Sequence, residues 1–182
     1  MTYATTLITR RLELRPLTAA DVDAAHAMWT DAGMRRFLWD DVVISRQTAA
    51  DAIAASDEDF ASRGFGLWGA YEPGSRALAG FCGCRSSESP EPELLYGFLP
   101  PWWGRGLAVE VSTAVLDHVF VSLEHSEVVA VTDPPNAASI RVMEKLGMTF
   151  ERRGTLNGLD TVFYRLTREV WLRARPDDAG GR

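Results

Sequence analysis

The residues most suggestive of chemistry lie between Tyr96 and Glu110, where the chain reads Tyr-Gly-Phe-Leu-Pro-Pro-Trp-Trp-Gly-Arg-Gly-Leu-Ala-Val-Glu. We expect a strand to end here, a short turn with Gly104 and Gly106 to follow, and a helix to begin. The unpaired N–H groups of such a turn, with the helix dipole behind them, form a site for an anion such as phosphate. The stretch contains neither Gly-x-x-x-x-Gly-Lys nor Gly-x-Gly-x-x-Gly. Because two spaced glycines often form an ordinary turn, this stretch alone leaves a phosphate site and a plain turn both open.

A second informative stretch begins at Asp133 and reads Asp-Pro-Pro-Asn-Ala-Ala-Ser-Ile-Arg-Val-Met-Glu-Lys-Leu-Gly-Met-Thr-Phe. We expect Asn136 at the N-terminus of a helix that directly follows a strand. Its side chain can cap that helix or offer its amide to a ligand, and Ser139 shares the same first turn. Capping and ligand binding therefore remain open for both residues.

The elements that must position these stretches follow from hydrophobic periodicity and turn residues. Strands are expected at 7–15, 65–71, 77–85, 93–99, 127–131, 149–156 and 161–166, and helices at 18–30, 45–63, 106–121 and 136–146. The order β-α-α-β-β-β-α-β-α-β-β favours an α/β (mixed α+β) fold with a central twisted mixed sheet flanked by helices. We expect one domain over 1–174 and a flexible tail over 175–182, which is polar and glycine-rich.

Composition limits the class of protein. The 182 residues are 46% hydrophobic and 24% charged, with a net charge of −6, which fits one globular domain and argues against nucleic acid as a partner. No stretch has the length and apolarity of a membrane span or a signal peptide, so we expect a cytoplasmic protein. Cys82 and Cys84 are spaced too closely for an ordinary disulfide and are expected to be small core residues. The three histidines show no metal-binding spacing, and no metal is expected.

Together the two stretches resemble the GNAT superfamily of acetyl-coenzyme A-dependent N-acetyltransferases, and most closely its RimJ/RimL-like branch. The pieces Trp-Trp-Gly-Arg-Gly-Leu-Ala-Val-Glu and Asn-Ala-Ala-Ser-Ile-Arg-Val-Met-Glu-Lys-Leu-Gly-Met are specific and stand in the family's order. The likeness extends from Thr9, which begins Thr-Arg-Arg-Leu-Glu-Leu-Arg-Pro-Leu, to Leu166, which ends Thr-Val-Phe-Tyr-Arg-Leu. It implies transfer of acetyl from acetyl-CoA to the amine of a peptide N-terminus or a small molecule. Family members are monomers or homodimers, and the sequence does not choose between these states.

The resemblance also implies where acetyl-CoA binds. Backbone amides of the glycine-bearing turn would hold the pyrophosphate, with Trp103, Gly104, Arg105, Gly106, Leu107 and Ala108 as the contact residues. Phe98 and Leu99 end the strand that would pair with the pantetheine arm, and a backbone N–H near Leu99 would polarise the thioester carbonyl. Asn136 matches a residue that often bonds the same arm, and Ser139 falls near the thioester.

Two proton transfers need side chains. The ammonium form of the acceptor must lose a proton, and Glu93, at the start of the central strand, is the candidate base. A solvated acid in the Glu-Pro-Glu loop is the alternative for Glu93. The family's usual tyrosine is replaced by Met143, so Ser139 is the candidate that protonates the leaving thiolate, with helix capping as its alternative. Pro100 stands where some relatives carry an acid, which weakens a detailed transfer of their mechanism.

The acceptor pocket is expected to involve the segment Met34-Arg-Arg-Phe-Leu-Trp-Asp-Asp, between the first two helices, and the central strand. Trp39 and Tyr96 are the expected contacts, and Asp40 or Asp41 can attract an ammonium group. A core aromatic and a solvated turn are the competing interpretations of this segment. Two other classes of protein also stay open: a non-catalytic acyl-CoA-binding module and an interaction domain that uses the glycines only as a turn.

Overall fold

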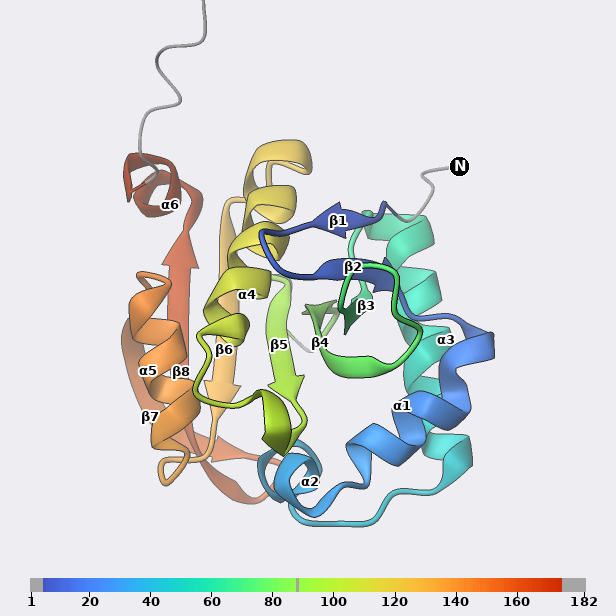
Figure 1. The fold of residues 1–182 in the computed structure, drawn as a ribbon. Coiled ribbons are helices and arrows are strands. Elements are labelled where there is room, and N and C mark those ends of the chain that lie inside the picture. Colours follow the sequence, from blue (N-terminus) through green and yellow to red (C-terminus); the bar gives the residue numbers. More distant parts are fainter. Residues whose placement is uncertain (1–4, 88, 175–182) are drawn as a thin grey trace, which may run out of the picture.

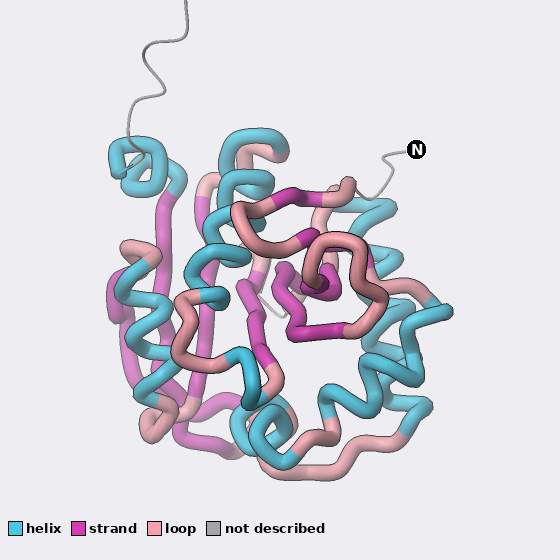
Figure 2. The backbone as a smooth tube through the Cα atoms, in the orientation of Figure 1, coloured by secondary structure: helices cyan, strands magenta, loops and turns pink. Residues whose placement is uncertain are grey.

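The computed structural model describes residues 5–87 and 89–174, and they form one eight-stranded sheet flanked by helices (Figures 1 and 2). The strand order is β1-β2-β3-β4-β5-β6-β8-β7, and every neighbouring pair is antiparallel except β5 and β6. The strands are β1 (Leu7–Ile8), β2 (Glu13–Pro16), β3 (Leu67–Tyr71), β4 (Leu78–Arg85), β5 (Glu93–Phe98), β6 (Glu127–Thr132), β7 (Thr149–Leu156) and β8 (Leu159–Thr167). The predicted mixed α/β fold is therefore confirmed.

The helices cover both faces of the sheet and bury two separate clusters of apolar side chains. They are α1 (Val22–Trp29), α2 (Ala32–Leu38), α3 (Arg46–Arg63), α4 (Leu107–Asp117), α5 (Ala137–Lys145) and α6 (Arg168–Ala174). One cluster joins α4, α5 and α6 to the sheet and includes Leu94 and Phe98. The other joins α1, α2 and α3 to the sheet and has Leu95 packed against it. Alternate residues of β5 thus face opposite helix layers, as the pleat of a strand requires.

The parallel pair β5 and β6 is joined only at its beginning. Glu93 pairs with Val129, and the Val129 N–H donates to the carbonyl of Pro92 at 3.0 Å. Beyond this point β6 pairs with β8 along its whole length, from Glu127 to Thr132, while the rest of β5 pairs only with β4 among the described strands. The sheet therefore opens between β5 and β6 toward their carboxyl ends.

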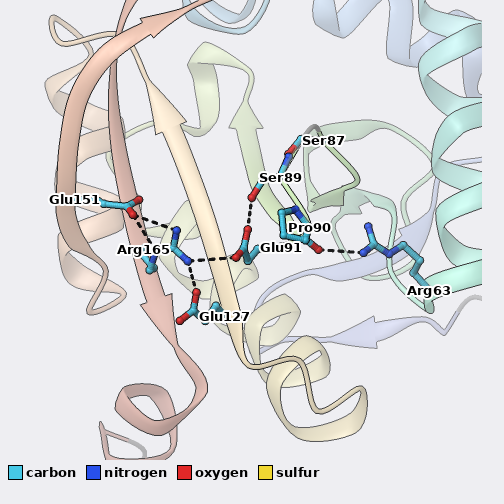
Figure 3. A network of polar contacts seen from close by, with 8 residues as sticks. All are labelled: Arg63, Ser87, Ser89, Pro90, Glu91, Glu127, Glu151 and Arg165. Carbon is cyan, nitrogen blue, oxygen red and sulfur yellow. Dashed lines mark hydrogen bonds and ion pairs between the residues drawn. The ribbon is translucent and has the colours of Figure 1, made fainter.

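An ionic network holds the closed end of this opening (Figure 3). The Arg165 guanidinium, on β8, lies among three carboxylates: Glu91 before β5, Glu127 on β6 and Glu151 on β7. The distances to Glu91 and Glu151 are 3.5 and 3.1 Å. Arg165 thus links the segment before β5 to the start of β6, where the two strands begin to diverge. A network of several charges stabilises a fold more than an isolated surface pair does.

The structure also corrects several predicted elements. The strand expected at 7–15 is two short strands, β1 and β2, because the chain turns through Thr9–Leu12. The segment expected to link the first two helices contains α2, whose N-terminus is capped by Asp31. The helix expected to reach residue 121 changes after Asp117 to a π-helical turn, His118–Ser122, and α6 was not predicted. Cys82 and Cys84 are free and buried, as expected, and the predicted tail at 175–182 lies outside the described residues.

Candidate active site

A cleft of about 1190 Å³ lies in the opening between β5 and β6. Its walls come from these two strands, the N-terminal end of α4, the length of α5, α2 with the loop after it, and the turn between β7 and β8. It brings together most of the residues expected to form the site, including the glycine-bearing turn, Asn136, Ser139, Glu93, Tyr96 and Trp39.

Beyond Glu93, the backbone of β5 presents to this cleft groups that no other described strand pairs. The Leu99 N–H donates to the Ala79 carbonyl at 3.0 Å, and β4 and β5 pair without a register shift from Glu93 to Phe98. Because backbone groups alternate in direction along a strand, those of Tyr96 and Phe98 point away from β4, on the side where the Pro92 carbonyl bonds β6. Of the N–H groups near Leu99, the one of Leu99 itself is therefore used within the sheet, and the one of Phe98 faces the opening.

The glycine-bearing turn has the backbone conformation that only glycine adopts readily. Gly104 and Gly106 have φ values of 72° and 73°, and Gly106 is the N-cap of α4. A Cβ at Gly104 would meet nothing within 4 Å, and at Gly106 only a terminal nitrogen of Arg11, at 4.0 Å. Both glycines are thus favoured by backbone geometry, and no other part of the protein fills the space beside them.

Several residues of the predicted donor site have side chains that contact other parts of the protein. Trp103 donates its indole N–H to the Phe98 carbonyl at 2.5 Å, and its ring packs on Gly33 of α2. Leu107 and Phe98 are buried in the core, and Trp103 uses the Phe98 carbonyl, so their backbone N–H groups are what remains for a ligand. Arg105 is exposed and stacks over Trp102 at 5.1 Å.

Asn136 makes the capping contact that was its alternative interpretation, whereas Ser139 supplies only the backbone N–H that is capped. The Ser139 N–H donates to Asn136 Oδ1 at 3.2 Å, and Asn136 Nδ2 donates to Thr132 Oγ1 at 3.0 Å. Both ends of the Asn136 amide are therefore used locally. The Ser139 hydroxyl, in contrast, points across the cleft toward β5.

Tyr96 and Ser139 bridge the cleft. The Tyr96 hydroxyl lies 2.9 Å from Ser139 Oγ and also donates to the Ser139 carbonyl at 3.1 Å. Burial raises the pKa of Tyr96 above its ordinary value, although the hydrogen bond with Ser139 lowers it. A phenol that stays protonated in a cleft is a hydrogen-bond donor and a possible acid. Met143, which stands where the family has a tyrosine, is buried in the core.

Glu93 lies at the closed end of the cleft and is buried, with 5% of its surface exposed. Its carboxylate pairs with Arg85 at 2.8 Å. This placement contradicts the alternative of a solvated acid in a loop.

The loop after α2 carries the acidic and aromatic residues expected near the acceptor. Asp40 and Asp41 both have positive φ values, 53° and 60°, which are uncommon for residues other than glycine. The Asp41 carboxylate pairs with Arg35 at 2.8 Å, whereas Asp40 lines the cleft. Trp39 also lines the cleft and packs at 6.0 Å from the Trp29 ring, so it is at once a wall residue and a core neighbour.

The charges around the cleft are not evenly distributed. Burial, with the charges of Asp40 and Asp160 nearby, raises the pKa of Asp133 above its ordinary value, so this region is acidic. Arg105 lines the cleft at the glycine-bearing turn, and Arg141 and Lys145 line it further along α5. One part of the cleft therefore suits a cation and another suits an anion.

Among the described residues, no group of three His, Cys, Asp or Glu side chains is arranged to hold a metal ion. Nor does any helix in that part of the chain have the length and apolarity to cross a membrane.

Comparison with known proteins decides the family. Residues 11–149 match the family described as the acetyltransferase (GNAT) domain. The chain belongs to this family. It is therefore an acetyltransferase of the GNAT type, and GNAT enzymes use acetyl-CoA as the acetyl donor.

Individual GNAT proteins resemble the chain over most of its length. An uncharacterized N-acetyltransferase, p20 of Bacillus licheniformis, is 26% identical over 167 residues, which cover 88% of this chain and 90% of that protein. An acetyltransferase of Agrobacterium tumefaciens has a similar structure, with a TM-score of 0.79 and 24% identity, covering 89% of this chain and 94% of the other. RimL, a ribosomal L7/L12 α-N-protein acetyltransferase solved with coenzyme A, has a TM-score of 0.75 and 19% identity. That likeness covers 90% of this chain and 98% of RimL. The last two likenesses establish the fold.

Proposed function

We propose that this GNAT enzyme transfers the acetyl group of acetyl-CoA to a cationic primary amine by direct attack while both substrates are bound. The observation that carries the proposal is a pair of backbone edges at one opening that no other described strand pairs: the cleft-facing groups of Tyr96 with the Phe98 N–H, and the α4 N-terminus behind Gly104 and Gly106. A strand edge suits the amides of a pantetheine arm, and a helix N-terminus suits a pyrophosphate. A single ligand that carries both groups fits this opening.

The donor would lie with its phosphates at the amides from Gly104 to Ala108 and its thioester near the end of β5. The Phe98 N–H, free of the β4 ladder, is the proposed hydrogen-bond donor to the thioester oxygen. Such a fixed backbone donor stabilises the charge that develops as the amine attacks.

The acceptor would enter through the acidic part of the cleft. Asp40 lines the cleft and Asp133 lies close enough to it that their charges interact. Two carboxylates beside the aromatic ring of Trp39 would attract an ammonium group and hold its carbon skeleton. We assign this role to Asp40 rather than to Asp41, because Asp41 is already paired with Arg35.

Three side chains are proposed to move protons. Glu93 would accept the proton of the ammonium through water, since its carboxylate lies at the closed end of the same cleft. The nitrogen of the neutral amine forms a bond to the acetyl carbon, the carbon–sulfur bond breaks, and the thiolate leaves with the electron pair. The linked hydroxyls of Tyr96 and Ser139 would supply a proton to that thiolate and regain one from the nitrogen, which carries an excess proton once it has bonded to the acetyl carbon.

The acceptor is proposed to be either a peptide α-amine or a small-molecule amine. The likeness in fold to RimL supports the first, and the sequence likeness to the RimJ/RimL-like branch points the same way. This assignment is tested by following release of free thiol from acetyl-CoA with peptides and small alkyl amines. Peptides with a free N-terminus should outperform the same peptides with a blocked N-terminus, and equal rates with both would refute transfer to the α-amine.

A further inference from the structure

The turn between β1 and β2 lies against the start of α4, about a hundred residues away in the sequence (Figure 1). Three donors converge there on one carboxylate. Glu110, in the first turn of α4, accepts from the Thr9 hydroxyl at 2.8 Å, the Arg11 N–H at 2.8 Å and Arg11 Nε at 2.7 Å. The side chain of Glu110 is only 15% exposed. This carboxylate is therefore firmly held, and it holds Arg11 in turn.

Arg11 also reaches the glycine-bearing turn itself. Its Nη1 donates to the Arg105 carbonyl at 2.9 Å, and its Nη2 stands 4.0 Å from the position that a Cβ of Gly106 would take. Because a trans peptide is planar, with its N–H and C=O pointing in opposite directions, fixing the Arg105 carbonyl also fixes the Gly106 N–H. That N–H must point away from Arg11, toward the open side of the turn.

The negative charge of Glu110 also assigns a role to Arg11. A carboxylate in the first turn of α4 would repel a diphosphate bound at the helix N-terminus, and this repulsion would oppose the helix dipole. Arg11 cancels that charge by a charge-assisted hydrogen bond to Glu110. Hydrogen bonds from Thr9 and Arg11 outweigh the effect of burial and hold the pKa of Glu110 below its ordinary value, so the carboxylate is charged at neutral pH.

We propose that Arg11, held by Glu110, is the positioning residue of the pyrophosphate turn: it orients the Arg105–Gly106 peptide and cancels the negative charge behind it. The inference rests on the proposed acetyl-CoA site. It adds a residue from the other end of the chain to the donor-binding machinery, and it predicts that the effect of Arg11 depends on the phosphates of the donor.

The test compares two donors, acetyl-CoA and S-acetyl-pantetheine, of which the second lacks the diphosphate. For Arg11→Met we expect kcat/KM with acetyl-CoA to fall about tenfold, the usual scale for one lost charge-assisted contact, with kcat at saturation nearly unchanged. With S-acetyl-pantetheine, kcat/KM should stay at the wild-type value. Arg10→Met is the matched control, because Arg10 is the exposed neighbour in the same turn.

The double variant Arg11→Met/Glu110→Gln separates the charge effect from simple damage to the fold. Removing the unpaired carboxylate should restore part of the lost kcat/KM with acetyl-CoA, although it removes a second member of the contact. Arg11→Lys, which keeps the charge but cannot bridge Glu110 and Arg105 together, should fall between wild type and Arg11→Met.

Distinct results would overturn the inference. If Arg11→Met lowers kcat/KM equally with both donors, or behaves like Arg10→Met with acetyl-CoA, the residue does not act through the phosphates. If the double variant is worse than Arg11→Met, the charge argument is wrong. Failure of the wild-type protein to use either donor would instead refute the proposed function, so the two failures are distinguishable.

Discussion

Replacement of Gly106 by alanine gives a quantitative test of the pyrophosphate turn. Gly106 has φ = 73°, and a left-handed conformation costs a residue with a Cβ about 1–2 kcal/mol. The new methyl group would meet only an arginine nitrogen at 4.0 Å, so backbone strain is the main cost to stability. Gly74, in the turn between β3 and β4, is a matched control, because its φ is 76°, it has nothing within 4 Å and it does not line the cleft.

Both variants should therefore lose similar stability and differ only in ligand binding. At about 2–4 °C per kcal/mol for a domain of this size, Gly106→Ala and Gly74→Ala should each melt roughly 2–8 °C below wild type. Acetyl-CoA at 100 times its Kd adds about 2.7 kcal/mol, or roughly 5–11 °C, to any variant that binds it normally. A methyl group that weakens binding about tenfold would halve that shift in Gly106→Ala, and Gly106→Trp should abolish it.

The assay is thermal melting with and without acetyl-CoA. Gly74→Ala should keep the full ligand-induced shift despite its lower melting temperature. An equal ligand-induced shift in Gly106→Ala and Gly74→Ala would show that the turn before α4 does not contact the ligand, and it would refute the assignment of the pyrophosphate site.

Three further predictions concern the acceptor, the leaving group and pH. Asp40→Asn should raise KM for a cationic amine several-fold in steady-state kinetics, whereas Asp41→Asn, whose native partner is Arg35, should not. Tyr96→Phe should lower kcat about tenfold at unchanged KM for acetyl-CoA, and an unchanged kcat would remove Tyr96 from the mechanism. Because the pKa of Glu110 is lowered on folding from 4.5, the stability advantage of wild type over Glu110→Gln should be complete above pH 4.5. In urea unfolding that advantage should shrink as the pH falls through the folded-state pKa, and a constant difference would contradict the contacts of Glu110.

Local signals made much of the fold predictable. The Asn157-Gly158 turn and the glycine after α5 both act within a few residues, so the sequence alone contains them. The helix α6 was missed because β8 continues directly into it, from Thr167 to Arg168, with no glycine or proline to mark the change. The helix α2 was missed because it is short and contains Gly33, which weakens any helical pattern.

The site was predictable where backbone conformation decides it and unpredictable where distant segments meet. Gly104 and Gly106 are visible in the sequence by their residue type, and their positive φ values favour glycine there. Whether the N–H of Leu99 or that of Phe98 faces the cleft depends on which residues of β5 bond β4. A shift of one residue in that ladder would exchange the two. The bridge from Tyr96 to Ser139 spans 43 positions, and no local pattern reports such a contact.

The contacts of Arg11 with Glu110 were not predicted, because they join residues still further apart in the sequence. Thr9 and Arg11 meet Glu110 across 101 and 99 positions. The sequence shows these residues only as parts of two family-like stretches, and the charged pair between them appears only in the folded chain. The structure therefore adds to the predicted site a support that comes from the opposite end of the sequence.

The most direct test of the account is a mass measurement on both product and protein after incubation with acetyl-CoA and an amine acceptor. Direct attack predicts an amine that is heavier by one acetyl group on its nitrogen, formed only when both substrates are present, while the mass of the protein stays unchanged. Direct attack would be contradicted if the protein itself became acetylated and passed its acetyl group to an amine added later. The proposed function would be contradicted if acetyl-CoA bound but neither the peptides nor the small alkyl amines became acetylated.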